Sequence, residues 1–262
     1  MLKALRIWLL GLFVTCVING YGQEQAPSQN RQLWLWFQFT KQLPKKFTIG
    51  FQYQLRLGNN MTRFTGENFY ANLGYKVNKY LSAGFTYQYF TSNKVDNHTF
   101  FFNLTAKYRY RRFTVGVRTA YQYVTEYFAN RYEKGHEPVN EWRNRLFLKY
   151  AVNRDWTIYA YSEPYLFFDP KYNARGIYVD KIRNLIGVDW QVYKYNTIGL
   201  FYYFQPEFTG KRPEYQHVIG LVYDLDLPKK VNWKKFFHPR KGKHKKGEED
   251  TPDNSDKEKL YD

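Results

Sequence analysis

The chain has 262 residues, a formal net charge of +17 and one cysteine. Aromatic residues make up 21% of it, with 26 Tyr and 22 Phe, yet the mean hydropathy is −0.68. This composition argues against an ordinary soluble core, which is richer in Leu, Ile and Val, and the lone cysteine excludes a disulfide framework or a thiolate metal site. It suits a barrel with aromatic girdles outside and a polar interior.

The first 22 residues have the features of a secretory signal peptide. A basic start precedes an apolar run over residues 7–18, and Gly20 and Gly22 stand at −3 and −1 of a cut before Gln23. Cys16 lies inside the run, so the mature chain is expected to carry no thiol. Beyond it, no stretch approaches the roughly 18 apolar residues of a spanning helix, which excludes a helical membrane protein. Residues 23–31 form a polar leader.

Strands of alternating polarity follow. In the hairpin Phe69–Tyr89 the odd positions are apolar or aromatic, the even ones are mostly polar or small, and the turn is at residues 78–80. Such alternation gives a strand one apolar and one polar face. Strands of about ten residues are longer than the usual five or six and fit a tilted crossing of a bilayer. The predicted strands are 32–40, 47–57, 69–77, 81–89, 98–110, 113–124, 141–152, 156–167, 181–192, 196–207 and 215–225.

The connections between these strands alternate in length. The short set is 78–80, 111–112, 153–155 and 193–195, and the long set is 58–65, 92–97, 125–140, 168–180 and 208–214. Short periplasmic turns at one rim and long loops at the other are typical of bacterial outer-membrane barrels. Such barrels normally have an even number of strands, whereas the pattern shows eleven. We therefore expect ten to twelve strands over residues 32–227, with the parity open. Either the segment 32–40 is not a full spanning strand, or the pattern misses or splits a strand elsewhere.

The predicted inward face carries the candidate site, a network of charged side chains. Parity places these residues in the lumen: Arg56, Lys76, Lys107, Arg109, Arg118, Arg143, Arg145, Lys149, Glu163, Arg183, Asp189 and Glu207, together with Glu141. If Val152 faces Trp156 across the 153–155 turn, Arg145 lies opposite Glu163, close enough for an ion pair. Structurally, the charges would fill and pair inside a narrow barrel; functionally, a cationic lumen would select anions.

Hydrolysis and metal binding have weaker support. An outer-membrane lipid hydrolase needs a histidine beside a Ser or Asp, and only His98, with Asp96 nearby, and His136, between Glu133 and Glu137, come near to such a pattern. No phosphate loop or dinucleotide fingerprint occurs. We therefore expect neither enzymatic activity nor a cofactor or metal, and a lipid hydrolase is the alternative.

The basic charge indicates the partners. A secreted chain rarely meets nucleic acid, so polyanionic lipid, sugar or small anions are favoured. Residues 228–262 are basic and then acidic, and we expect a disordered periplasmic tail. The alternative is that Trp233, Phe236 and Phe237 place the tail on the inner leaflet of the outer membrane.

Several of these residues resemble a known family. The start at Trp34 and Trp36, the hairpin running into Arg56, Gly74-Tyr75, the Arg143-x-Arg145 pair and Glu163 resemble the bacterial barrels of the domain-of-unknown-function 2490 family. The resemblance spans roughly residues 32–225. It implies an outer-membrane β-barrel and implies no activity, because the family has none established.

The last strand resembles the signal read by the barrel-assembly machinery. Gly220, Tyr223 and Leu225 match that signal, whereas Val218 replaces its usual polar residue and a long tail follows.

Taken together, these features predict an all-β, antiparallel, outer-membrane barrel, porin-like, with a cationic interior: a small channel or an anion-binding barrel. A soluble periplasmic lipid-binding barrel, with its apolar face turned inward, is a further alternative.

Overall fold

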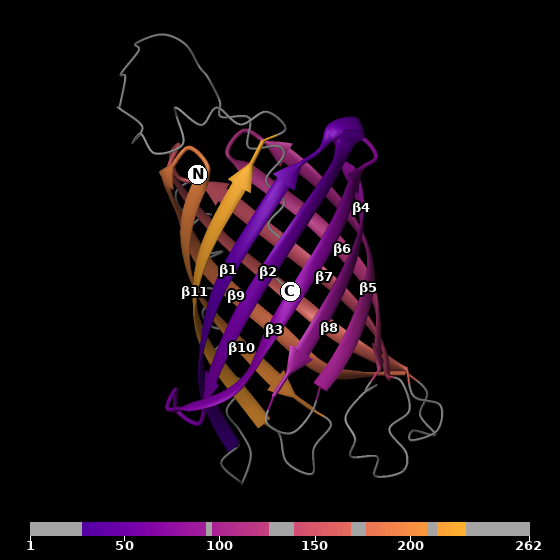
Figure 1. The fold of residues 1–262 in the computed structure, drawn as a ribbon, viewed down its shortest axis with the longest axis vertical. Helices are drawn as coiled ribbons and strands as arrows, with labels where there is room; N and C mark the ends of the chain where they lie inside the picture. Colours follow the sequence, from indigo (N-terminus) through magenta and orange to yellow (C-terminus); the bar gives the residue numbers. More distant parts are fainter. Residues whose placement is uncertain (1–27, 93–95, 126–138, 169–176, 209–213, 229–262) are drawn as a thin grey trace, which may run out of the picture.

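The chain folds into a closed β-barrel of eleven strands (Figure 1). The computed structural model describes residues 28–92, 96–125, 139–168, 177–208 and 214–228. The expected signal peptide, residues 23–27 of the leader and nearly all of the tail lie outside the described residues, as does His136. Within the described ranges there is no helix long and apolar enough to span a bilayer.

Nearly all the strands are longer than the sequence pattern suggests, by up to six residues at an end. They are β1 (Ser28–Gln42), β2 (Phe47–Gly58), β3 (Arg63–Lys76), β4 (Leu81–Thr91), β5 (Asp96–Tyr110), β6 (Phe113–Thr125), β7 (Val139–Ala151), β8 (Trp156–Phe168), β9 (Ile177–Tyr193), β10 (Asn196–Glu207) and β11 (Glu214–Leu227). A single turn of 3-10 helix, Pro44–Lys46, joins β1 to β2.

The odd strand number is accommodated by a parallel seam. Each strand pairs antiparallel with its neighbour in sequence, and β1 closes the barrel by pairing parallel with β11, from Ser28 beside Glu214 to Lys41 beside Leu227. An up-and-down barrel with an odd number of strands must close in this way, because its first and last strands run in the same direction. The doubt about residues 32–40 was therefore unfounded: they form the middle of a full strand.

Asparagines shape two of the tight turns. The side-chain oxygen of Asn78 accepts backbone N–H bonds from Tyr80 and Leu81 at 2.8 and 2.9 Å. Asn153 does the same for Asp155 and Trp156 at 2.8 and 2.9 Å. These bonds satisfy turn amides that the ladder leaves without partners. They hold the rim of short turns at the top of Figure 1.

One predicted long loop is short. The connection predicted at 58–65 is the turn 59–62, because β3 starts at Arg63 rather than near Phe69. Asn59, Asn60 and Met61 have positive φ values of 48°, 59° and 68°, which produce the tight turn. The first six residues of β3 are mostly polar and do not alternate, so the sequence pattern missed them. The β2–β3 pair also contains a bulge, at Arg56/Leu57.

The apolar face of every strand points outward. Phe51 and Phe102 are 55% and 57% exposed, whereas Gln54 and Asn68 are fully buried. Parity alone left inside and outside interchangeable, and the structure resolves this by placing the amide and charged side chains within. A lipid-binding barrel with an apolar lumen is therefore the wrong interpretation.

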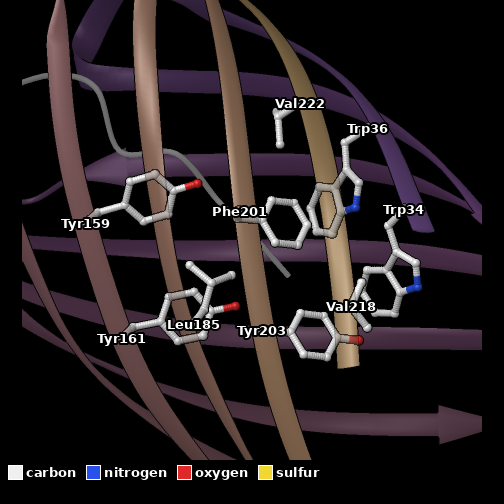
Figure 2. Packing of buried hydrophobic residues seen from close by; sticks show 9 residues of the cluster. All are labelled: Trp34, Trp36, Tyr159, Tyr161, Leu185, Phe201, Tyr203, Val218 and Val222. Carbon is white, nitrogen blue, oxygen red and sulfur yellow. The ribbon is translucent and has the colours of Figure 1, made fainter. Parts of the chain in front are cut away.

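Large and small inward residues alternate between neighbouring strands. Figure 2 shows the cluster formed by aromatic rings of β1, β8 and β10 with aliphatic side chains of β9 and β11: Trp34, Trp36, Tyr159, Tyr161, Leu185, Phe201, Tyr203, Val218 and Val222. A Cβ atom added to Gly220 would clash with Cζ of Phe201, its direct partner on β10. The ring therefore occupies the space above the glycine. Val218 departs from the usual polar residue because it packs within this cluster.

We expect Gly220→Ala to destabilise the barrel. The Phe201 ring is buried and packs edge-on against Trp36 at 6.0 Å, so it has no room to yield to the new methyl group. Overpacking of this kind costs about 1–3 kcal/mol in the free energy of unfolding. The matched control is Gly74→Ala, whose Cβ would meet Thr48 at an ordinary 3.7 Å. Equilibrium unfolding in urea should show a lower midpoint for Gly220→Ala alone, and equal midpoints would contradict the packing argument.

Candidate functional site

The centre of the barrel interior is a single carboxylate held by three guanidinium groups. Glu163, on β8, has no exposed surface. Its Oε1 accepts from Nη2 of Arg118 at 2.8 Å, and its Oε2 accepts from Nη2 of Arg143 and of Arg145 at 3.0 Å each. The three arginine side chains are only 4–6% exposed. We call these four residues the Glu163 cluster.

Strand register builds the cluster. Arg143 and Arg145 lie two residues apart on β7, so both point inward. The pairs Arg143/Tyr165 and Leu146/Ser162 keep one register between β7 and β8, which sets Arg145 opposite Glu163, as the sequence predicts. Arg118 reaches the same carboxylate from β6, two strands away, because the closed wall curves around it.

The cluster is electrostatically unbalanced. Arg118 and Arg145 are direct cross-strand partners, an arrangement that repels unless a negative charge lies between them. Glu163 supplies that charge, but one carboxylate against three guanidiniums leaves an excess of positive charge. Aromatic rings stabilise part of this excess positive charge through cation–π contacts. Cζ of Arg145, for example, lies 4.1 Å from the Tyr161 ring centre.

A second group of inward residues extends the cluster toward the rim of long loops. Arg183 donates from Nε to Oε1 of Gln205 at 3.0 Å and lies 4.9 Å from the Tyr203 ring centre. The guanidinium of Arg56 lies 4.1 Å above the ring of Trp34. Hydrogen bonds and ring faces, rather than carboxylates, hold both cations.

Glu207 and Lys181 complete this region. Oε1 of Glu207 accepts from Gln205 at 2.6 Å and from Gln216 at 2.7 Å. Lys181 pairs with Asp180 at 3.1 Å and approaches Glu141 at 3.9 Å. The predicted network omitted Lys181, although it shares the parity of Arg183. Asp180 lies outside the predicted strand, where the β8–β9 ladder shifts by one residue at Tyr165/Leu166.

At mid-height, described side chains fill the interior of the barrel, and we call this region the middle layer. An eleven-stranded barrel lies between small barrels that side chains fill and the wide porins that carry a water channel. Here inward side chains from many strands have 0–2% exposure: Gln54, Asn68, Thr86, Thr105, Glu163, Tyr203, Val218 and Val222. Solvent reaching through the lumen would expose them. The barrel is therefore plugged by its own side chains at mid-height.

Between this layer and the rim of short turns lies a cavity of about 470 Å³. We call it the cationic cavity. Eight basic residues and two acidic ones line it: Lys79, Lys107, Arg109, Arg112, Arg118, Arg145, Lys149 and Arg154, with Asp155 and Asp189. Arg118 and Arg145 belong to the Glu163 cluster and form its inner end, while Lys79, Arg112 and Arg154 come from the short turns.

A smaller cavity of about 300 Å³ lies beside it against β1–β5. The two share Tyr80 and Lys107. This second cavity has a more balanced lining, with Lys46, Lys76 and Lys107 against Asp224 and Asp226. The excess of positive charge therefore belongs to the cationic cavity.

The structure divides the predicted network between these places. Lys107, Arg109, Arg118, Arg145, Lys149 and Asp189 line the cationic cavity, Lys76 lines the second cavity, and Arg56, Arg143, Glu163, Arg183 and Glu207 lie in the middle or toward the long loops. Strand parity missed Lys79, Arg112 and Arg154, since turns have no parity. All three lie in the short connections, which share one rim of the barrel, and this feature of the sequence could have identified them.

The described histidines face outward and contact tyrosines. Nδ1 of His98 is 2.7 Å from the Tyr87 hydroxyl, and Nδ1 of His217 is 2.7 Å from that of Tyr202. Across the described residues, no three His, Cys, Asp or Glu side chains come together as a metal site. These histidines thus lie on the opposite side of the wall from the charged interior.

Comparison with known proteins identifies a family and finds distant similarity to solved structures. The model of the family described as "Protein of unknown function (DUF2490)" matches residues 31–216. No curated protein matches the chain. Among solved structures, the "Bacterial polysaccharide outer membrane secretin" is similar at 11% identity with a TM-score of 0.42, over 65% of this chain and 72% of that one.

Glu163→Gln should destabilise the protein strongly. The amide keeps the shape but removes the one negative charge among three buried guanidiniums, and breaking a buried ion pair costs about 3–5 kcal/mol in unfolding free energy. Glu207→Gln is the control, because its two neutral donors keep an acceptor oxygen and the expected loss is about 1 kcal/mol. Urea unfolding of the two variants tests this prediction. Equal unfolding midpoints would show that the charge of Glu163 is not essential for the stability of the barrel interior.

Proposed function

The chain belongs to the DUF2490 family, and we propose that it is an outer-membrane barrel that binds an anionic ligand in its cationic cavity, without enzymatic activity. The observation that carries the proposal is the cavity itself. Eight basic residues against two acidic ones line it, it opens toward the short turns, and the Glu163 cluster closes its inner end.

The outer wall supports the membrane location. Outward residues at mid-strand are mostly apolar, and aromatic pairs encircle the barrel near the short turns, as in membrane barrels with aromatic girdles. The pairs are Phe37–Tyr223, Phe47–Tyr75, Tyr80–Tyr108, Phe113–Tyr150 and Trp156–Trp190, with ring centres 4.7–6.1 Å apart. Further pairs lie toward the other rim, including Phe100–Tyr123 and Phe204–Tyr215 at 6.4 and 5.5 Å. The outer-membrane lipid is thus the first partner.

The charge and shape of the cavity support an anionic ligand. Basic groups gathered behind low-dielectric walls attract anions from solution. The volume of about 470 Å³ is within the range of small-molecule sites, and Phe147 and Tyr159 add apolar surface to its wall. The ligand class is therefore a small multivalent anion rather than an extended polymer.

Binding is favoured over free conduction. A channel needs a continuous water path, whereas the side chains of the middle layer are almost completely buried. Passage would require the three ion pairs of Glu163 to separate together. If short turns are periplasmic, as in bacterial barrels, the cavity opens to the periplasm.

The hydrolase alternative has less support. A hydrolase needs a nucleophile beside a positioned base, in a site that can hold the substrate. His98 and His217 contact tyrosine hydroxyls on the outer wall, far from the cationic lining. We therefore assign no catalytic role to either histidine.

Cell fractionation tests the membrane location. We expect the protein to sediment with the outer membrane, and the unboiled detergent extract to migrate differently from the boiled one in an electrophoresis gel, because a closed barrel resists unfolding by detergent. Recovery in the soluble periplasmic fraction would contradict the proposed location.

Inorganic pyrophosphate serves as the probe for anion binding. Isothermal titration of the detergent-solubilised protein should detect binding that weakens as salt is added, since screening reduces charge attraction. Removing one charge near the anion costs about 1 kcal/mol even at the dielectric constant of water, so the double variant Arg109→Ala/Lys149→Ala should bind at least about tenfold more weakly.

Arg63→Ala is the matched control for this titration. Arg63 is exposed at the start of β3, on the rim of long loops, so its removal lowers the net charge without touching the cavity. The proposal requires its affinity to stay near that of the unaltered protein. The control removes one charge and the cavity variant two, so an equal loss of binding free energy per removed charge would show that the overall charge, not the cavity, attracts the anion.

A further inference from the structure

The outer wall has one polar interruption. Thr119, Asn144, Ser162 and Asn184 lie at outward positions in the middle of β6, β7, β8 and β9, four neighbouring strands. In the other described strands, outward residues that are neither apolar nor aromatic lie near strand ends, as Lys41 and Glu67 do. We call these four residues the polar stripe.

The stripe is continuous across the strands. Thr119 pairs directly with Asn144, and Ser162 pairs directly with Asn184. Asn144 and Ser162 are diagonal neighbours between β7 and β8, within reach of one another. The Trp142 indole N–H donates to Oγ1 of Thr119 at 2.8 Å and also lies 3.2 Å from Oδ1 of Asn144. The polar groups thus form one patch rather than four scattered substitutions.

The same part of the wall is uneven. Ala160 and Ser162 give the outer face of β8 a row of small side chains. Leu146, opposite Ser162, is 59% exposed, and Ile186, opposite Ala160, is 52% exposed. The small side chains of Ala160 and Ser162 therefore lie between two exposed apolar ones; we call the former the hollow and the latter its ridges.

We propose that the outer face of β7, β8 and β9 is a contact surface for a second copy of this chain. The proposal rests on the membrane location proposed above, because only lipid makes exposed mid-wall amides unfavourable. Serine and asparagine side chains each carry donors and acceptors, so the stripe can pair with its own copy. In a two-fold pair, the Leu146 and Ile186 ridges of one copy fill the hollow of the other.

A second copy fits this surface better than lipid does. Acyl chains offer no hydrogen bonds, whereas small residues let two walls approach and Ser and Asn hydrogen-bond across membrane interfaces. A two-fold contact uses the same patch on both partners, so ridge, hollow and self-complementary polar groups must all occur on one surface. They do so here within three strands.

Cysteine crosslinking in isolated outer membranes tests the contact. Ser162→Cys, treated with a short bis-maleimide, should give a dimer of this chain. Leu73→Cys is the control: it is 46% exposed and outward on β3, at the other side of the barrel order, and should give none. The control also reports any crosslink made through Cys16, the chain's own cysteine.

A second variant keeps the test independent of crosslinking. Ser162→Leu/Asn184→Leu makes the stripe apolar and should shift the detergent-solubilised protein from dimer to monomer in sedimentation velocity, while the boiled-versus-unboiled mobility difference persists. Folded Ser162→Cys protein in the outer membrane that crosslinks no more than Leu73→Cys, or crosslinks to another polypeptide, overturns the contact and leaves the location standing. Failure to find the protein in the outer membrane overturns both.

Discussion

Closing eleven strands into a barrel forces every second side chain into one narrow interior, and that constraint governs the rest of the structure. An interior of this width must be packed, and the sequence fills it with arginine, glutamine, asparagine and tyrosine more than with aliphatic residues. Such side chains are stable inside only when their polar groups are bonded. The carboxylates of Glu163 and Glu207 meet that need, the first through three arginines and the second through two glutamines.

Much of this architecture was predictable because strand periodicity is a local property. Phe47–Leu57 and Asn196–Glu207 alternate without interruption, so their bounds followed from sequence to within a residue. The Arg145–Glu163 pair was also predictable. A three-residue turn makes Val152 and Trp156 partners, and the partners of all earlier residues in the hairpin follow by counting back from them. A turn of known length thus predicts pairing between the two strands that it joins, but not pairing with any further strand.

What the sequence could not show depends on closure. Arg118 reaches Glu163 across β7, a contact between strands that do not pair, and the register of each hairpin says nothing of it. The same holds for the parallel seam, which exists only because β1 and β11 meet. Which face is inside is likewise a property of the closed barrel, since period-two alternation is unchanged when the two faces are exchanged.

The aromatic composition has a function inside the barrel as well as outside it. A carboxylate beside an arginine neutralises its charge, whereas a ring face holds the guanidinium and leaves the charge in place. Arg56 over Trp34 and Arg183 beside Tyr203 are held in this second way, and Arg145 combines a ring face with its share of Glu163. A lumen of arginine and tyrosine can therefore be packed and still remain positive. This explains how one barrel interior is both closed at mid-height and electrostatically suited to receive an anion above the closure.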